Sequence, residues 1–440
     1  MLLTNKTLYF FLFFFTANFL FSQNNWLVKN PNGFDFYITT KVEKNTLVGY
    51  SRPKALKEII GGLNFSLIKS TTSIKHPEII HFKGLLNNSY YEGEFQNLFD
   101  QSNFKAKITK DSLIIHIQNK NGAKSFIKAK KVEKIKPLRN YKETFKSIFK
   151  LTEDNIYNPL FIESKDWKKF KKQMNKLSKS INDDYELQIA FYAFARKFPF
   201  SHYYLGKHKE TTNNANGFSG FANLKHVNTK TCILKIDGFY GSKKEMDSLI
   251  KIINNKNYKN LIIDLRDNQG GDLEAAFPLA EFIIDHPIIA GVFPNKNWYE
   301  DFKKLPTKDD YSKFTEFTGG TLDQWYKKAS ENYGAYYKVN PSKIHFNGQV
   351  YILTNTNTAS TCEPLVFGLK HHKFATVIGE NTAGAMLSAK QFVIENIFEL
   401  TIPLNDYITY SGERIDNKGV KPNIEVKSTE ALKYVLDLIE

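Results

Sequence analysis

The stretch that decides the fold is Gln349–Ala385, QVYILTNTNTASTCEPLVFGLKHHKFATVIGENTAGA. Its apolar run Val350–Leu353 predicts one buried strand, and its β-branched run Ala375–Ile378 predicts another. Between them, Thr361–His372 is compatible with a helix. The stretch therefore predicts a strand, a polar turn, a helix and a second strand, with Ser360 in the turn.

The position of Ser360 is compatible with two roles. A serine between a buried strand and a helix start exposes its hydroxyl beside unpaired backbone N–H groups, which can stabilise negative charge on an attacked carbonyl. Serine is also a favoured helix N-cap. The turn alone therefore leaves open whether Ser360 is a nucleophile or a cap.

The same alternation extends toward the N-terminus and predicts an α/β core over 206–440. The predicted strands and helices are Cys232–Ile236, Lys243–Asn254, Leu261–Leu265, Gly271–Asp285 and Ile288–Phe293. Several of these strands lack polar alternation, which predicts a parallel or mixed sheet covered on both faces. The polar and aromatic interval 294–346 interrupts the rhythm. It is either a substrate-binding lid or a surface excursion with its own aromatic core.

The N-terminal part divides into a β-rich region, 23–138, and a helical segment, 139–205. The predicted strands of the first are Phe34–Thr39, Thr46–Tyr50, Asn64–Ile68, Glu78–Leu85, Tyr90–Phe95, Ser112–Gln118 and Ser125–Lys131. They predict a small sandwich or a partial barrel. We expect His76, His81 and His116 to be single strand histidines on the surface or in the core rather than metal ligands.

Residues 1–22 have the pattern of a secretory signal peptide. Lys6 precedes the apolar run Leu8–Phe15, and the small residue Ser22 precedes a polar start. The run is short for a membrane span, so we expect cleavage, no membrane span afterwards, and a periplasmic or extracellular protein. Cys232 and Cys362 adjoin predicted core elements, where buried free thiols are ordinary; a disulfide between them stays open.

Composition argues against a nucleic-acid partner. The chain has 440 residues and a formal net charge of +16, with 61 Lys and Arg against 45 Asp and Glu. The basic residues are mostly scattered lysines and form no arginine-rich stripe, which is typical of a solvated surface. The chain is long enough for two or three folded units.

A second glycine-rich turn stands near the middle of the chain. Leu261–Gly271 reads LIIDLRDNQGG, a strand followed by Gly270 and Gly271 and then by a predicted helix. Paired glycines at such a turn expose N–H groups and let another backbone come close. Neither phosphate-binding glycine pattern is present, and N–H donors without a lysine suit an oxyanion better than a polyphosphate.

The motifs DLRDNQGG, TASTCE and TVIGENTAG, in this order, resemble the C-terminal processing, or tail-specific, serine peptidases over about Ser201–Val426. The resemblance implies a crotonase/ClpP-like α/β core and a nucleophile at Ser360. It also implies an oxyanion hole made by the first N–H after the nucleophile, at Thr361, and by Gly270 or Gly271. No metal or organic cofactor is implied.

The lysine base of many family members is missing, because Ala385 occupies its position. Lys390 lies five residues further on, outside the motif. The tricorn-protease-like branch instead takes its base from a Ser-His pair, and Ser201-His202 resembles that pair. Near the branch's G-V-x-P-D motif, here ending in Asn423, Asp416 stands where glutamate is usual, and Glu413 is the rival carboxylate.

The sequence therefore predicts an exported serine-type endopeptidase that cleaves proteins or peptides through an acyl-enzyme at Ser360. His202 would be the general base, Asp416 would orient it, and Ser201 would support either of them. A catalytically decayed peptide- or hydrophobic-ligand-binding protein on the same fold is the alternative.

Overall fold

The computed structural model describes residues 23–440 except 32, 73, 99–100 and 210–219. The predicted signal peptide, 1–22, lies outside the described residues. Two compact units make up the rest, and we describe each by itself. The first combines the chain up to Arg139 with Ile181–Leu187, and the second combines Asn140–Ser180 with Gln188–Glu440. Among the described residues, no helix is both long and apolar enough to cross a membrane.

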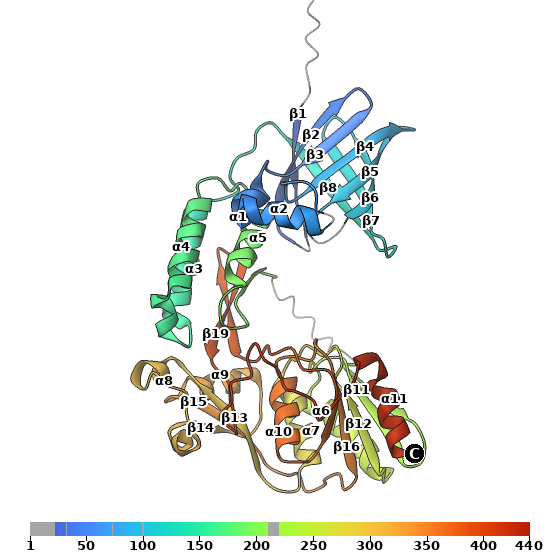
Figure 1. Ribbon diagram of the computed structural model, residues 1–440, viewed down its shortest axis with the longest axis vertical. Coiled ribbons are helices and arrows are strands. Elements are labelled where there is room, and N and C mark those ends of the chain that lie inside the picture. The colour runs from blue at the N-terminus through green and yellow to red at the C-terminus, as the bar shows by residue number, and fades with distance from the viewer. Residues whose placement is uncertain (1–22, 32, 73, 99–100, 210–219) are drawn as a thin grey trace, which may run out of the picture. The chain divides into compact units, whose positions relative to one another are not determined.

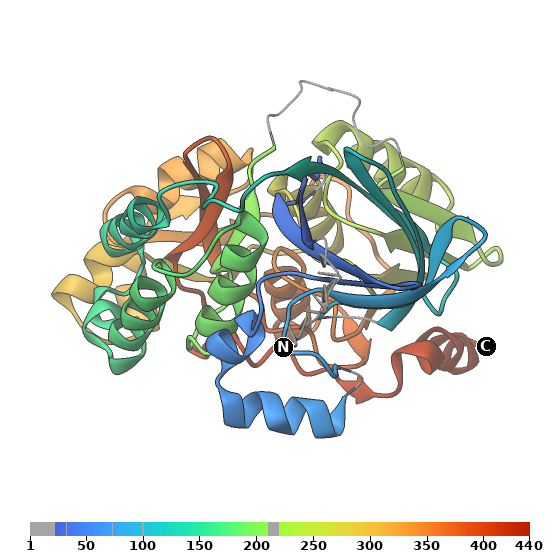
Figure 2. The ribbon, with the colours of Figure 1, turned by 90° about the horizontal axis from the view of Figure 1, so that it is seen from above.

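The first unit is built on a closed antiparallel barrel of eight strands in sequence order (Figures 1 and 2). Its strands are β1 (Gln23–Val28), β2 (Phe36–Glu43), β3 (Thr46–Tyr50), β4 (His81–Asn87), β5 (Tyr90–Gln96), β6 (Gln101–Ile108), β7 (Ser112–Gln118) and β8 (Lys124–Val132). Pairing of β1 with β8 closes the barrel. Buried Trp26, Phe82, Phe95 and Phe104 fill it.

Two features of this unit differ from the sequence-based prediction. Asn64–Ile68 is not a strand but part of helix α2 (Gly62–Thr71), which follows α1 (Ala55–Ile60). The five residues Asn64–Ile68 are too few to distinguish the two-residue hydrophobic period of a strand from the 3.6-residue period of a helix. In addition, β1 and β6 were not predicted, since their sequences, QNNWLV and QSNFKAKI, are rich in polar residues.

Residues 181–187 complete the first unit through buried carboxylates. Asp183 accepts a hydrogen bond from the Tyr37 backbone N–H at 3.2 Å, and Asp184 pairs with Arg139 at 2.7 Å. Arg52 Nε donates to Glu186 at 2.9 Å, and the Glu186 side chain is 3% exposed. Burial raises the pKa of Asp183 to about 7. This short segment therefore belongs energetically to the barrel.

A six-stranded sheet organises the second unit (Figure 1). Its order is β10 (Ala222–His226), β11 (Thr231–Ile236), β12 (Asn260–Asp264), β16 (Gln349–Thr354), β17 (Thr376–Gly379) and β21 (Ile424–Glu425). All neighbours are parallel except β10 and β11. The alternation of strands and helices had predicted this mixed sheet.

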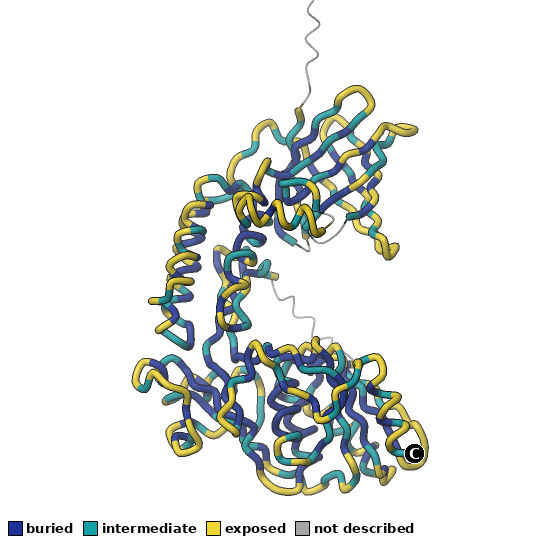
Figure 3. The backbone as a smooth tube through the Cα atoms, in the orientation of Figure 1, coloured by how far each residue is buried: buried dark blue, intermediate teal, exposed yellow. Residues whose placement is uncertain are grey.

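Helices cover both faces of the sheet. The helices α6 (Lys243–Asn255), α7 (Leu273–Ile283) and α10 (Cys362–His371) share the larger apolar core with one face, and α11 (Ser428–Ile439) packs on the other. In Figure 3 the dark blue of buried residues follows the strands and the helices of the larger core, whereas α11 carries much exposed surface. Cys232 and Cys362 are buried free thiols.

The interval 294–346 contributes to a second, four-stranded sheet. This sheet has the order β14 (Thr315–Phe317), β15 (Gly334–Val339), β13 (Ile288–Pro294) and β20 (Ile408–Thr409). Three short helices accompany it: α8 (Lys296–Asp301), η2 (Lys308–Lys313) and α9 (Leu322–Ser330). Trp298 and Trp325 are buried in aromatic clusters. The interval therefore has an aromatic core, one of the two predicted possibilities.

A helical layer precedes the loop that carries Ser201 and His202, and a small sheet contains the strand that follows this loop. The helices are α3 (Tyr141–Asn155), η1 (Pro159–Glu163), α4 (Lys165–Leu177) and α5 (Asp184–Ala195). The three-stranded sheet has the order β18 (Ser388–Ile394), β19 (Phe398–Asn405) and β9 (Tyr204–Lys207). The loop between α5 and β9 is bounded by an aromatic cluster that includes Phe198, Phe200 and Tyr203.

Candidate active site

Ser360 occupies a strained turn between β16 and α10. Its φ is +55°, a left-handed conformation that is uncommon for a residue with a side chain. Its backbone N–H donates to the Ala385 carbonyl at 3.1 Å. In the part of the chain that the structure describes, the Ser360 hydroxyl has no hydrogen-bond partner. Such strain costs about 1–3 kcal/mol and is found at functional sites.

The Gly270-Gly271 turn packs directly on this serine. The Ala359 N–H donates to the Asn268 carbonyl at 3.0 Å, and Thr361 Oγ1 donates to the Gly271 carbonyl at 2.6 Å. A Cβ added at Gly270, whose φ is +98°, would come within 2.6 Å of Ser360 Cβ. Glycine is therefore required at this position both by backbone conformation and by space.

Two backbone N–H groups beside Ser360 remain unbonded. Gly270 N–H donates to the Asn268 side chain at 2.8 Å and is thereby occupied. Within the described residues, the N–H groups of Gly271 and Thr361 have no hydrogen-bond partner. Of the two glycines predicted for an oxyanion hole, Gly271 is therefore the one with an available donor.

Ser201 links Asp416 to His202. Ser201 Oγ donates to Asp416 Oδ1 at 2.5 Å and lies 2.7 Å from His202 Nδ1. The His202 backbone has a φ of +57°, again left-handed. Burial lowers the pKa of His202, and the charge of Asp416 opposes that effect. Asp416 therefore acts on the imidazole through the serine hydroxyl.

Asp416 joins this chain to the Ser360 turn. Its side chain has no exposed surface, and it accepts from Ser201 N–H at 3.0 Å, from Met386 N–H at 3.1 Å and from Arg414 at 3.2 Å. Met386 follows Ala385, whose carbonyl holds the Ser360 N–H. The Asp416 carboxylate is thus connected to Ser360 through two backbone hydrogen bonds, one at Met386 and one at Ala385.

The other candidates lie away from this chain. Glu413 is exposed, and among the described residues its carboxylate accepts only a 3.4 Å hydrogen bond, from Ser411. Lys390 is an exposed residue of β18 whose ammonium lies 6.0 Å from the Tyr326 ring. Asn423, at the motif position where aspartate is usual, exchanges hydrogen bonds with Val377 of β17. Its role there is to fix strand pairing.

Glu363, the last residue of the TASTCE motif, was expected from the sequence to have a structural, capping or pairing role near the site, and it has one. It is fully buried and accepts hydrogen bonds from Thr382 Oγ1 at 2.6 Å, from Gly384 N–H at 2.8 Å, from Ala385 N–H at 2.8 Å and from Ser360 N–H at 3.3 Å. Burial raises its pKa to about 7, and these donors oppose the rise. Glu363 braces the Ser360 turn against the loop after β17.

No role was predicted from the sequence for Arg414 or Asn268. Arg414 donates to Asp406 at 2.9 Å and to the Tyr157 hydroxyl at 3.0 Å while it contacts Asp416. Asn268 bonds both Gly270 N–H and the Ile236 carbonyl. Asn268 stands inside the DLRDNQGG motif and Arg414 follows Glu413, but neither has a sequence spacing that predicts its hydrogen-bond partners.

A small apolar cavity of about 40 Å³ adjoins Thr361. Its lining consists of Leu273, Ala276, Phe277, Ala280, Ile288, Ala290, Tyr337, Val339, Thr361, Pro364, Leu365, Gly368 and Leu369. Tyr337 and Val339 come from the interval 294–346. That interval thus contributes to the surroundings of Thr361.

Residues 230–426 match the family described as peptidase family S41. This segment is similar to the S41 peptidases. It contains Ser360, the Gly270-Gly271 turn and Asp416, whereas Ser201 and His202 precede it.

Relatives of this segment include the carboxy-terminal processing protease CtpA of Bacillus subtilis, strain 168. It is 24% identical over 192 residues, which are 43% of this chain and 33% of that protein. The match therefore spans about a third of that relative's length.

Two solved structures are similar to a larger part of the chain. A lipoprotein from Streptococcus agalactiae is 15% identical, covers 70% of this chain and 98% of its own, and has a TM-score of 0.44. The tricorn protease is 11% identical, covers 92% of this chain and 53% of its own, and also has a TM-score of 0.44.

Proposed function

We propose that this protein is an exported serine-type endopeptidase with a crotonase/ClpP-like S41 core. Ser360 would be the nucleophile, and His202 would be the general base. The observation that carries the proposal is the hydrogen-bonded chain from Asp416 through Ser201 to His202, held next to the Ser360 turn. The predicted signal peptide motivates export to the periplasm or the extracellular space.

The chain of hydrogen bonds supports the His202 tautomer that is protonated at Nδ1. An ionised aspartate only accepts hydrogen bonds, and the Ser201 hydroxyl has one proton, which it gives to Asp416. The hydroxyl oxygen then accepts from His202 Nδ1–H. His202 Nε2 therefore carries the lone pair that a general base needs.

The reaction follows from these positions. As Ser360 Oγ attacks the scissile carbonyl carbon, its proton moves to His202 Nε2, and the N–H groups of Gly271 and Thr361 bind the oxyanion. His202 returns the proton to the leaving amine, and an acyl-enzyme remains. A water molecule, deprotonated by His202, then releases the acid product and frees Ser360.

The small apolar cavity beside Thr361 would hold a substrate side chain of modest size next to the scissile bond. Protein or peptide substrates fit the family that residues 230–426 match. The missing lysine at Ala385 fits a base supplied from outside the S41 segment, and His202 is such a base.

The alternative function is a peptide- or hydrophobic-ligand-binding protein that has lost its chemistry. One observation favours it: within the described residues, neither Ser360 Oγ nor His202 Nε2 has a hydrogen-bond partner. A resting peptidase tolerates this arrangement, because catalytic hydrogen bonds often tighten only with substrate.

The test replaces Ser360 with alanine. Ser360→Ala should lower cleavage of a fluorogenic peptide library by roughly 10⁴-fold or more, and it should abolish labelling by a fluorophosphonate. The exposed Ser411→Ala variant is the control and should retain both. Equal turnover by Ser360→Ala and wild type would refute the peptidase proposal, and absence of labelling and cleavage in the folded wild type would favour the binding protein.

A further inference from the structure

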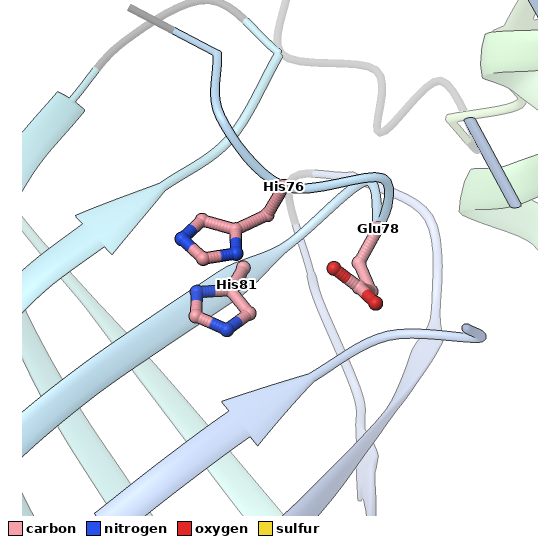
Figure 4. Close-up of side chains that lie close together, drawn as sticks. All are labelled: His76, Glu78 and His81. Carbon is pink, nitrogen blue, oxygen red and sulfur yellow. The ribbon is translucent and has the colours of Figure 1, made fainter. Parts of the chain in front are cut away.

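Three potential metal ligands gather at the start of β4 in the first unit (Figure 4). His81 is the first residue of β4, whereas His76 and Glu78 lie in the segment before it. The sequence had suggested that His76 lies on a strand, but the structure places it before β4. The chain folds back there, so that His76 lies against His81.

The chemistry and spacing of this group suit a divalent transition metal. One ligand atom from each of His76, Glu78 and His81 lies within 4.8 Å of the others. Two imidazole nitrogens and one carboxylate oxygen are a ligand set that zinc accepts in three-ligand sites. All three side chains are half-buried, so an ion has a route of entry.

The backbone around the group is held in place. Gln96 lies directly opposite His81 on β5, and its Oε1 accepts from the backbone N–H groups of Lys75 at 2.7 Å and of His76 at 3.2 Å. The Ile80 N–H donates to the Ser51 hydroxyl at 3.2 Å, and the Ser51 N–H donates to the Ile80 carbonyl at 3.0 Å. Both ends of the 76–81 segment are therefore anchored, which lowers the entropic cost of assembling three ligands.

The two imidazoles stack face to face, with ring centroids 3.4 Å apart and an interplanar angle of 6°. A metal lies in the plane of each imidazole that binds it, so two parallel stacked rings cannot share one ion. Coordination requires one ring to turn about its side-chain torsions, and χ2 of histidine is a soft torsion. Metal binding should therefore separate the stack.

We propose that His76, Glu78 and His81 form a binding site for a divalent transition-metal ion, Zn²⁺ foremost. The three side chains supply three ligands, and water completes a tetrahedral shell from the adjoining surface pocket. Lys83, Glu92 and Glu94 also line that pocket beside both histidines. Glu94 offsets the positive charge of Lys83 near the ion, whereas Glu92 is paired with Lys105 at 2.8 Å.

The test is calorimetric titration of the metal-free full chain with Zn²⁺ alone, without an affinity tag. The wild type should bind one equivalent at this site. His76→Gln, Glu78→Gln and His81→Gln should each weaken that binding by more than the ~10–100-fold that loss of an outer-shell partner costs. His116→Gln changes an exposed histidine of the same barrel and should bind as the wild type.

Ring resonances give a second readout that does not depend on the variants. Zinc should shift the NMR signals of His76 and His81 and leave that of His116 in place. Ser360→Ala should bind zinc as the wild type does, because the site lies outside the S41 segment. Absence of zinc binding by the wild type, or equal binding by the wild type and the His76→Gln and His81→Gln variants, would overturn the site.

Discussion

At the scale of single residues, the proposed catalysis depends on the protonation of His202. The imidazole must be neutral at Nε2 to accept a proton, and burial lowers its pKa below the ordinary value of about 6.5. The acid limb of activity should therefore lie below pH ~6.5, since His202 stays neutral as the pH falls through that value.

Asp416→Asn provides the matching prediction. Loss of the negative charge removes the interaction that raises the pKa of His202, so the acid limb should move to lower pH. The rate should also fall, by roughly 10⁴-fold if the carboxylate orients the base as in serine peptidases. The rate of fluorophosphonate labelling between pH 4 and 8 (roughly the range where His titrates) measures both. An acid limb that moved upward would contradict this role.

Glu413→Gln is its control. The Glu413 side chain is exposed and is not bonded to Ser201 or His202, so both the rate and the pH profile should be those of the wild type. A larger effect from Glu413→Gln than from Asp416→Asn would reverse the choice between the two carboxylates.

The sequence named Ser201, His202 and Asp416 as candidates and expected Ser201 to support the base or the carboxylate, but it did not predict that the Ser201 hydroxyl bridges the two. Ser201 and Asp416 lie 215 positions apart, and no local spacing predicts that a serine hydroxyl stands between a carboxylate and the next residue's ring. Likewise, His76 and His81 read as separate histidines, because a fold-back of the 76–81 segment is invisible to a search for alternating strands.

At the scale of elements, the strand–turn–helix around Ser360 depends on the loop that follows β17. Glu363, in the first turn of α10, gathers four donors, three of them from Thr382, Gly384 and Ala385. The helix thus carries the acceptor, and the loop carries most of the donors. The Ser360 turn keeps its left-handed backbone only while both are in place.

Glu363→Gln should disturb this arrangement. An amide has one oxygen and directs its NH₂ group at donors, so at least one buried N–H loses its acceptor at a cost of about 1–3 kcal/mol. We expect a lower free energy of unfolding in urea and a lower kcat, with KM nearly unchanged. Glu380→Gln, whose carboxylate caps Ser428 N–H at 3.1 Å, is the matched control. Equal kcat values for the two variants would exclude the brace.

Element prediction succeeded where runs were long and apolar. The strands over Cys232–Ile236 and Leu261–Leu265 and the helix after Ser360 were expected from periodicity, and the structure has β11, β12 and α10 there. Prediction failed at Asn64–Ile68, where a short amphipathic run satisfies either period. Closure of the barrel could not be predicted either, because β1 and β8, which pair to close it, lie at the two ends of the β-rich region.

At the scale of the whole molecule, the first unit is discontinuous in sequence. Residues 181–187 contribute Asp183, Asp184 and Glu186 to it, although 41 residues of the second unit, 140–180, intervene. The buried Glu186 is paired with Arg52, and its backbone N–H donates to Asp183 at 2.9 Å. The barrel strands alone therefore lack part of their electrostatic complement.

A fragment of residues 23–195 should accordingly be more stable than a fragment of residues 23–139. Removal of one partner from a buried ion pair costs about 3–5 kcal/mol, so the shorter fragment should unfold at a lower urea concentration when followed by circular dichroism. Asp184→Ala with Glu186→Ala in the longer fragment should remove most of the difference. Identical midpoints for the two fragments would show that 181–187 contributes nothing to the barrel.

The closure of the barrel by residues at both ends of a long stretch also sets an order of events during synthesis. Strand β1 cannot find its partner β8 until residue 132 has left the ribosome, and the carboxylates at 183–186 arrive still later. Contacts of such sequence separation form slowly, because loop closure must precede them. A chain that stays unfolded for so long remains threadable, which is consistent with the proposed export.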